Sequence, residues 1–167
     1  RALTTLAGAS IPRGGMRDGL KKAEETVERF AGRDPGHLVW QRERLRFRFF
    51  KMQLESRERR VDTEARRADL KAQVSLLAEL RDDVERSVRD DPEYYLGLAD
   101  LANFDARIAE RHLDLLSIAG EGDDHLAEAE KRLTASLATY DRLRARSPES
   151  VDWRQGRNFA LSQSARL

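Results

Sequence analysis

Histidine and carboxylate side chains are the groups of this chain best suited to metal binding or acid–base catalysis. The histidines His37, His112 and His125 lie far apart in the sequence, and none completes the Glu-x-x-His pair used by metal sites in helical bundles. Glu110 and His112 are two positions apart, so they face different directions on a helix. Residues 123–125, Asp-Asp-His, instead resemble a helix N-terminus, where acids complement the helix dipole. We therefore predict no metal site and no cofactor.

Other common signatures of enzyme chemistry are also missing from the sequence. The chain has no cysteine, which excludes disulfides and thiolate metal sites. The segment Arg13-Gly14-Gly15-Met16 lacks the Lys-Ser/Thr pair that completes a phosphate-binding loop. No serine stands in a nucleophile-elbow pattern. The chain is therefore predicted not to be an enzyme.

Residues 42–51 interleave basic and aromatic side chains, a pattern that can bind single-stranded nucleic acid through charge and base stacking. Its candidate contacts are Arg42, Arg44, Arg46, Arg48 and Lys51, and further arginines extend the basic run to residue 67. On a helix, however, the aromatic residues fall at core spacing, and Glu43 and Glu55 interrupt the positive run. Nucleic-acid binding through residues 42–67 is therefore the weaker alternative to protein binding.

A third candidate site recurs along the chain as an acidic residue followed by arginine. The pairs are Glu28-Arg29, Glu85-Arg86 and Asp141-Arg142. Their arginines could form a ladder that clamps the carboxylates of a peptide, because guanidinium binds carboxylate through two parallel hydrogen bonds. Alternatively, each arginine pairs with an acid of the adjacent repeat and fixes the stacking of helices. We favour the second interpretation and keep Arg29, Arg86 and Arg142 as candidate partner-binding residues.

These pairs belong to a sequence repeat with a period of about 56 residues, marked by Pro35, Pro92 and Pro148. When the chain is aligned on these prolines, several upstream columns agree: Leu20, Leu77 and Leu133 in one, and Val27, Val84 and Tyr140 in another. Trp40 and Trp153 recur after the proline, whereas Gly97 stands there in the middle copy. Agreement of several columns in one register indicates a structural repeat.

Each repeat is predicted to be a hairpin of two helices that meet at its proline, because proline breaks a helix but fits the first turn of the next one. The predicted helices cover residues 16–33, 36–60, 64–90, 93–118, 123–146 and 149–167. Residues 1–7 are interpreted as the end of a preceding helix and residues 8–15 as a loop. Hairpins are then expected over 16–63, 64–122 and 123–167, the last one truncated, in a fragment of a longer protein.

Composition agrees with amphipathic helices, since 40% of residues are hydrophobic, 37% are charged and only 7% are aromatic. The net charge of +1 hides a positive first part, up to residue 60, and a negative remainder, so the first part could favour an acidic partner. No apolar run is long enough for a membrane span, and no signal peptide opens the chain. Together with the missing cysteines, this favours the cytoplasm.

The segment Asp34-Pro35-Gly36-His37-Leu38-Val39-Trp40-Gln41-Arg42 is similar to the boundary between helices in bacterial tetratricopeptide-like repeats. Residues 147–155 match this boundary again, preceded by residues 137–143, which resemble the end of such a repeat's first helix. The chain departs from the usual 34-residue unit in its longer helices and in the middle copy, which lacks the tryptophan. The resemblance implies an α-solenoid, of the kind found beside bacterial effector domains such as kinases, TIR domains or caspase-like proteases.

The sequence therefore predicts an all-α fold of about six helices, arranged as a solenoid of hairpins. Its expected function is protein–protein interaction or scaffolding within a larger bacterial signalling or defence protein. A protein or peptide is the expected partner, with self-association as a further possibility. A passive architectural spacer is the other alternative that we retain.

Overall fold

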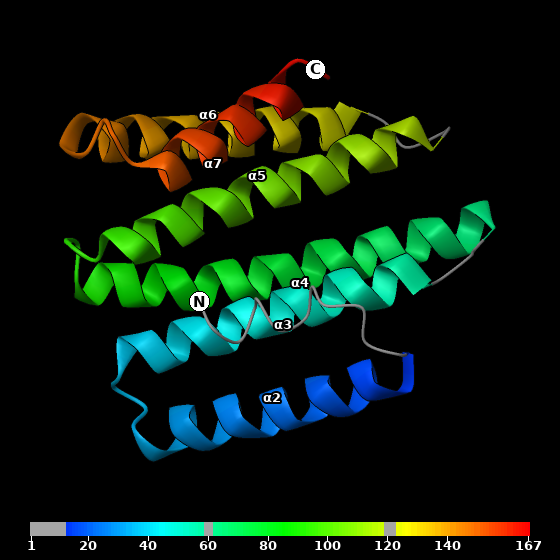
Figure 1. Ribbon diagram of the computed structural model, residues 1–167. Helices are drawn as coiled ribbons and strands as arrows, with labels where there is room; N and C mark the ends of the chain where they lie inside the picture. Colours follow the sequence, from blue (N-terminus) through cyan, green and yellow to red (C-terminus); the bar gives the residue numbers. More distant parts are fainter. Residues whose placement is uncertain (1–12, 59–61, 119–122) are drawn as a thin grey trace. The chain divides into compact units, whose positions relative to one another are not determined.

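The structure is a computed structural model that describes residues 13–58, 62–118 and 123–167, and all its regular elements in these residues are α-helices (Figure 1). The helices are α2 (Arg13–Arg33), α3 (Leu38–Glu58), α4 (Thr63–Asp90), α5 (Tyr95–Ser117), α6 (Asp123–Arg146) and α7 (Val151–Ser164). The all-α prediction is therefore confirmed, with each helix close to its expected range. One boundary was wrong, because α2 begins at Arg13, inside the expected loop of residues 8–15. Residues 1–12 lie outside the described residues.

The three prolines stand in the same kind of turn. The carbonyl oxygen of the residue before each proline accepts a hydrogen bond from the backbone N–H three positions further on. The distances are 3.1 Å from His37 to Asp34, 3.0 Å from Tyr94 to Asp91 and 3.2 Å from Ser150 to Ser147. The preceding helix ends there because proline offers no N–H to its last turn. The predicted helix breaks are thus confirmed, each with the same backbone hydrogen bond.

The chain divides into two compact units, residues 1–58 and residues 59–167, which are described separately. In the first unit α2 packs against α3. Val27 and Ala31 of α2 and Leu45 and Met52 of α3 are buried. Beside them Phe30 stacks on Trp40, with ring centroids 4.6 Å apart. Apolar residues spaced three, four or seven apart place these side chains on one face of each helix.

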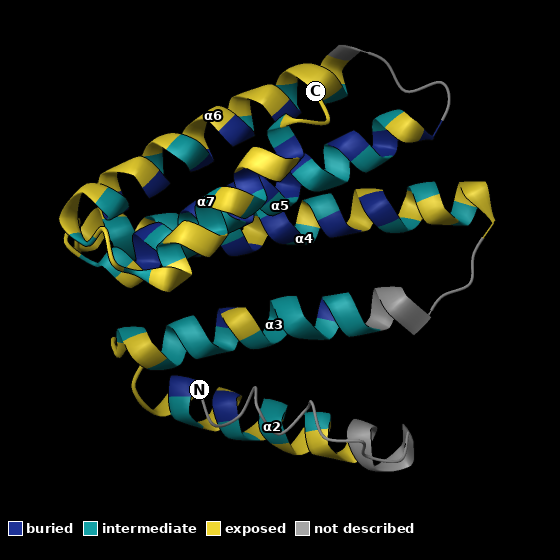
Figure 2. Cartoon of the chain, turned by 45° about the horizontal axis from the view of Figure 1, so that its top comes forward, coloured by how far each residue is buried: buried dark blue, intermediate teal, exposed yellow. Residues whose placement is uncertain are grey.

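In the second unit α5 is the central helix and packs against α4, α6 and α7 (Figure 1). It carries more buried residues than any other described helix (Figure 2). Small side chains allow its neighbours to approach: Ala106 and Ala109 form one cluster with Ala160 of α7 and Leu133 of α6. A second cluster brings together Trp153, in the first turn of α7, and Leu98 and Tyr95, in the first turn of α5. Helices α5 and α7 therefore run parallel.

Within the described part of the chain, no helix is both long enough and apolar enough to cross a membrane.

Candidate functional site

The arginines of the expected ladder lie on the surface. Arg86 has a side chain that is 69% exposed and pairs with Asp83 in its own helix. Arg29 is exposed, and its guanidinium carbon lies 5.2 Å from the centre of the Phe30 ring. Arg142 is exposed on α6. The ion pair of Arg86 therefore lies within α4, so this arginine does not make the pair between repeats that we favoured. Binding of a partner by the three arginines stays a prediction.

The basic residues of α3 lie among acids of the first unit. The ion pairs are Arg44–Glu28 at 3.5 Å, Arg46–Glu43 at 3.4 Å and Lys51–Glu24 at 2.8 Å. Arg42 and Arg48 are half-buried, as are the three phenylalanines of this segment. Part of the positive charge is therefore already neutralised, and the rings contribute to packing. This arrangement weakens the case for a nucleic-acid surface on α3.

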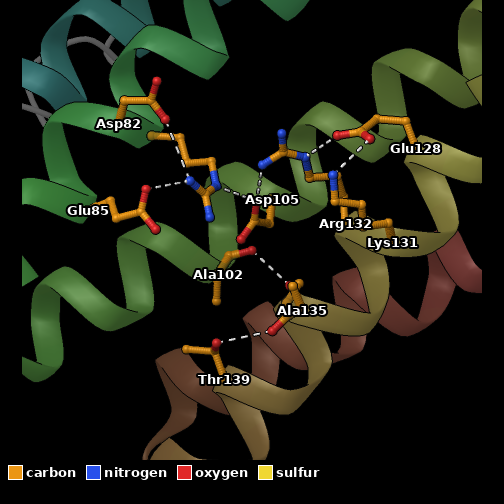
Figure 3. A network of polar contacts seen from close by, with 11 residues as sticks. Asp82, Glu85, Ala102, Asp105, Glu128, Lys131, Arg132, Ala135 and Thr139 are labelled. Carbon is orange, nitrogen blue, oxygen red and sulfur yellow. Dashed lines mark hydrogen bonds and ion pairs between the residues drawn. The ribbon is translucent and has the colours of Figure 1, made fainter.

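A buried carboxylate joins three helices of the second unit. Asp105 of α5 has a side chain that is only 4% exposed. Its Oδ1 accepts a hydrogen bond from Arg81 Nε of α4 at 2.7 Å and another from Arg132 Nη1 of α6 at 3.0 Å (Figure 3). Among the residues that the structure describes, Asp105 is the one charged residue that is fully buried. A carboxylate this deep requires such partners, because burying an unpaired charge is very costly.

Each of the two guanidinium groups also reaches an acid in its own helix. Arg81 Nη1 donates to Glu85 Oε2 at 3.0 Å, and Arg132 Nε donates to Glu128 Oε1 at 2.7 Å. Figure 3 shows the resulting chain of charges, which runs from Glu85 through Asp105 to Glu128. We call Arg81, Glu85, Asp105, Arg132 and Glu128 the polar seam.

Two histidines meet near one end of the polar seam. His112 lies near the end of α5 and His125 in the first turn of α6, and both are half-buried. Their Nδ1 atoms are 2.8 Å apart, within hydrogen-bonding distance. Glu128 lies one turn after His125 on α6, so the same face of α6 supplies both the histidine contact and the seam carboxylate.

Protonation equilibria in this region are perturbed by burial and by neighbouring charges. Burial lowers the pKa of His112, and the charges of His125 and Arg132 lower it further against the opposing effect of Glu128. Burial favours the neutral form of Glu128, but hydrogen bonds and charges from Arg132 and Lys131 outweigh it and lower the pKa of this carboxyl group.

The pKa of Arg81 is set by a similar competition between burial and neighbouring charges. Burial lowers the pKa of its guanidinium, but the hydrogen bond and charge of Asp105 and the charge of Glu85 outweigh burial and raise the pKa. Such clusters of perturbed groups occur at functional sites and also in structural ion-pair networks.

The geometry favours a structural role for the polar seam, because the buried carboxylate is already occupied by two guanidinium groups. Among the described residues, no cluster of three or more His, Cys, Asp or Glu side chains could hold a metal ion. Ser136 supports the same interface, since its buried hydroxyl donates to the carbonyl oxygen of Ala102 at 2.7 Å. The seam therefore fixes how α4, α5 and α6 pack.

Sequence reasoning missed both the polar seam and the histidine pair. Asp105 does not belong to a repeated column, because the same position relative to the proline holds Arg48 in the first repeat and Leu161 in the third. A charged residue within the apolar face of residues 98–113 was the available signal for the seam. For the histidines, the signal was the spacing of His125 and Glu128, which places them on one helix face.

Comparison with known proteins gives no match, since no protein-family model, no curated protein and no solved structure matches the chain.

Proposed function

We propose that this chain is a non-catalytic protein-interaction module, built from stacked helical hairpins of the tetratricopeptide-like kind. It would recognise a protein or peptide, or a second copy of the parent protein, within a larger cytoplasmic signalling or defence protein of a bacterium. A repeated surface feature carries this proposal. Each second helix that the structure describes has an exposed apolar residue in its first turn, four, four and three positions after the proline: Val39, Leu96 and Val151, with exposed fractions of 54%, 48% and 53%.

Single exposed apolar residues are common on protein surfaces, but here an exposed apolar residue recurs in the first helical turn after each proline. In the second unit, Leu96 and Val151 lie at the same end of the parallel helices α5 and α7, because Trp153 packs beside Leu98 and Tyr95. Apolar residues repeated along one edge of stacked hairpins would provide a partner with several equivalent contacts.

The packing of α5 and α7 supports the proposed solenoid. These are the second helices of consecutive hairpins, and they are in contact along their length. Ion pairs reinforce the contact between hairpins: Arg166 to Asp114 at 2.7 Å and Arg146 to Glu93 at 2.6 Å. In repeat arrays, each helix packs on its partner and on the next repeat, as α5 does.

The test is a binding experiment with the double variant Leu96→Ser, Val151→Ser. Self-association of the chain is measured by analytical ultracentrifugation, and proteins captured from cells of the source organism are identified and then titrated as purified components. We expect the double variant to lose at least about tenfold in affinity, because two apolar contacts worth about 1 kcal/mol each are removed.

Leu126→Ser is the matched control, since Leu126 is 41% exposed but lies on α6, away from the first turns of α5 and α7. It should bind within about twofold of the unmodified chain, and both variants should keep its unfolding temperature. Unchanged binding by the double variant would contradict the proposal. Absence of any protein partner and of self-association would favour a passive spacer.

Nucleic-acid binding is tested with a random single-stranded oligonucleotide by fluorescence polarisation. The ion pairs Arg44–Glu28 and Lys51–Glu24 reduce the free positive charge on α3. We therefore expect no binding even at about 50 mM salt, where phosphate contacts are strongest. Binding that weakens steeply with salt, and further in the variant Arg46→Glu, would favour the alternative function.

A further inference from the structure

The contact between His112 and His125 restricts how many protons the two imidazole rings can hold. Their Nδ1 atoms are 2.8 Å apart, with ring centroids 5.0 Å apart and ring planes tilted by 49°. At this distance one Nδ1 must donate a proton and the other must accept it with its lone pair. The pair therefore forms when both rings are neutral or when the two rings share a single positive charge.

A second positive charge is incompatible with this contact. If both rings are cationic, both Nδ1 atoms carry a hydrogen and neither can accept. Two N–H groups would then oppose each other, and two like charges would lie about 5 Å apart in a half-buried setting. Full protonation of the pair must break the hydrogen bond and separate the rings.

The surrounding charges do not remove this restriction. Glu128 favours a proton on His112, whereas Arg132 and His125 oppose it. Glu128 is itself bound by Arg132 at 2.7 Å and by Lys131 at 3.3 Å.

The other charged groups around this part of the unit have partners of their own. The acids on α5, Glu110 and Asp114, pair with Arg107, Arg111 and Arg166, the last of these from α7. On α4, Asp69 accepts from Gln73, and the apolar Leu70 and Val74 pack with Leu115 and Ile118 at the end of α5. Arg67 and Lys71, which flank Leu70 on α4, also have interaction partners. Asp124, in the first turn of α6, is exposed to solvent.

We propose that His112 and His125 form a proton-controlled latch, which holds the end of α5 against the first turn of α6 near neutral pH and opens in mild acid. The location makes the latch effective, because the two histidines join the ends of two helices that follow each other in the chain. Its opening would loosen the first turn of α6 without removing the clusters around Leu133 and Tyr140 further along. The latch does not depend on the proposed protein-binding function.

The direction of the pH effect follows from the lowered pKa of His112, caused by burial and then by the charge of His125. A histidine in the open or unfolded chain takes up its proton near the ordinary value of 6.5, but His112 in the closed pair, whose pKa is lowered, takes up its proton only at lower pH. The latch therefore contributes fully above about pH 6.5, and its contribution is lost as the pH falls through the lowered pKa. Below pH 6.5 the ratio of open to closed form rises by up to about tenfold per pH unit, because opening lets His112 take up one proton.

The test is hydrogen exchange with mass spectrometry on the whole chain, from about pH 7.5 to about pH 5.5, corrected for the pH dependence of intrinsic exchange. Peptides covering the end of α5 and the first turns of α6 should lose protection on acidification, by roughly tenfold over the range. Peptides from the middle of α5 should change much less. Equal changes in both regions, or no change in either, would overturn the proposal.

A double-mutant cycle with His112→Gln and His125→Gln tests the pairing itself. The two substitutions should be coupled at about pH 7.5, and the coupling should be weaker at about pH 5.5, where protonation favours the open form. His37→Gln is the matched control, since His37 is exposed in the first unit, and it should leave the profile unchanged. A coupling free energy between the two substitutions that is absent at both pH values, or equal at both, would contradict the proposed latch.

If a variant does not fold, nitrogen NMR of the two imidazole rings in the unmodified chain decides the question. One Nδ1 should be protonated and the other unprotonated at neutral pH, and the His112 ring should take up its proton only below the ordinary value of 6.5. Two rings that titrate independently, each with an unprotonated Nδ1 at neutral pH, would overturn the proposal.

Discussion

Replacing Asp105 by asparagine is the most direct test of the polar seam, because the amide has nearly the same shape as the carboxylate but no charge. In the unmodified chain, Asp105 accepts from Arg81 at 2.7 Å and from Arg132 at 3.0 Å. After the substitution, both guanidinium groups remain within the interface and can donate to an amide oxygen at best. The change therefore isolates the charge of the seam from its packing.

The expected cost follows from the burial of the three groups. Removing one partner of a fully buried ion pair costs roughly 3–5 kcal/mol. Here the guanidinium side chains remain 18% and 21% exposed, and each keeps a second acid, Glu85 or Glu128. Solvent and these acids offset part of the loss, so we expect Asp105→Asn to lower the free energy of unfolding by about 2–3 kcal/mol.

Thermal and urea unfolding followed by circular dichroism measure this cost. For a unit of this size, the loss corresponds to a fall of about 8–12 °C in the unfolding temperature. Glu93→Gln is the matched control, because Glu93, in the turn before α5, pairs with Arg146 at the end of α6, but both side chains are largely exposed. It should cost no more than about 0.5 kcal/mol.

An unfolding temperature of Asp105→Asn within about 1 °C of the unmodified chain would show that the charge of Asp105 does not stabilise the interface. A further variant separates charge from burial. Asp105→Leu combined with Arg81→Met and Arg132→Met removes all three charges together. It should recover much of the stability, since a well-packed apolar group often replaces a buried ion pair at little cost.

Gly156→Ala and Ser136→Ala test the packing of the second unit, and Gly19→Ala in the first unit is the control for the glycine substitution. Gly156→Ala should lower the free energy of unfolding by about 1–2 kcal/mol in urea titrations, because a methyl group there would overlap the ring of Tyr140. Gly19→Ala in α2, which has open space around it, should instead raise stability by up to about 1 kcal/mol, and the same sign for both would contradict this account. Ser136→Ala removes the buried hydrogen bond to the Ala102 carbonyl and should cost about 1 kcal/mol; a neutral effect would show that this bond adds nothing.

Much of the secondary structure was predictable because it depends on local physics. Proline cannot donate in the preceding turn, so Pro35, Pro92 and Pro148 separate the helices whatever packs around them. Apolar spacing then identified buried positions such as Val27, Leu77 and Leu133. The solenoid arrangement stays a proposal, as does the tetratricopeptide-like resemblance.

The candidate sites were less predictable, because a repeated residue is not necessarily a buried one. Arg29, Arg86 and Arg142 recur in the sequence yet all three are exposed, and Arg86 pairs inside its own helix. Their recurrence places them on a common helix face, but the choice of partner depends on the rotamer of a long side chain and on which acids lie within its reach.

The positions of the three helix breaks at the prolines and the apolar face of each helix could be read from the sequence, since they follow from proline geometry and helical periodicity. Which polar groups meet depends on how the helices pack, and this could not be read from the sequence. Asp105 lies 24 positions from Arg81 and 27 from Arg132, and His112 lies 13 from His125. Contacts at such separations depend on the register in which neighbouring helices pack, and many small apolar contacts set that register together.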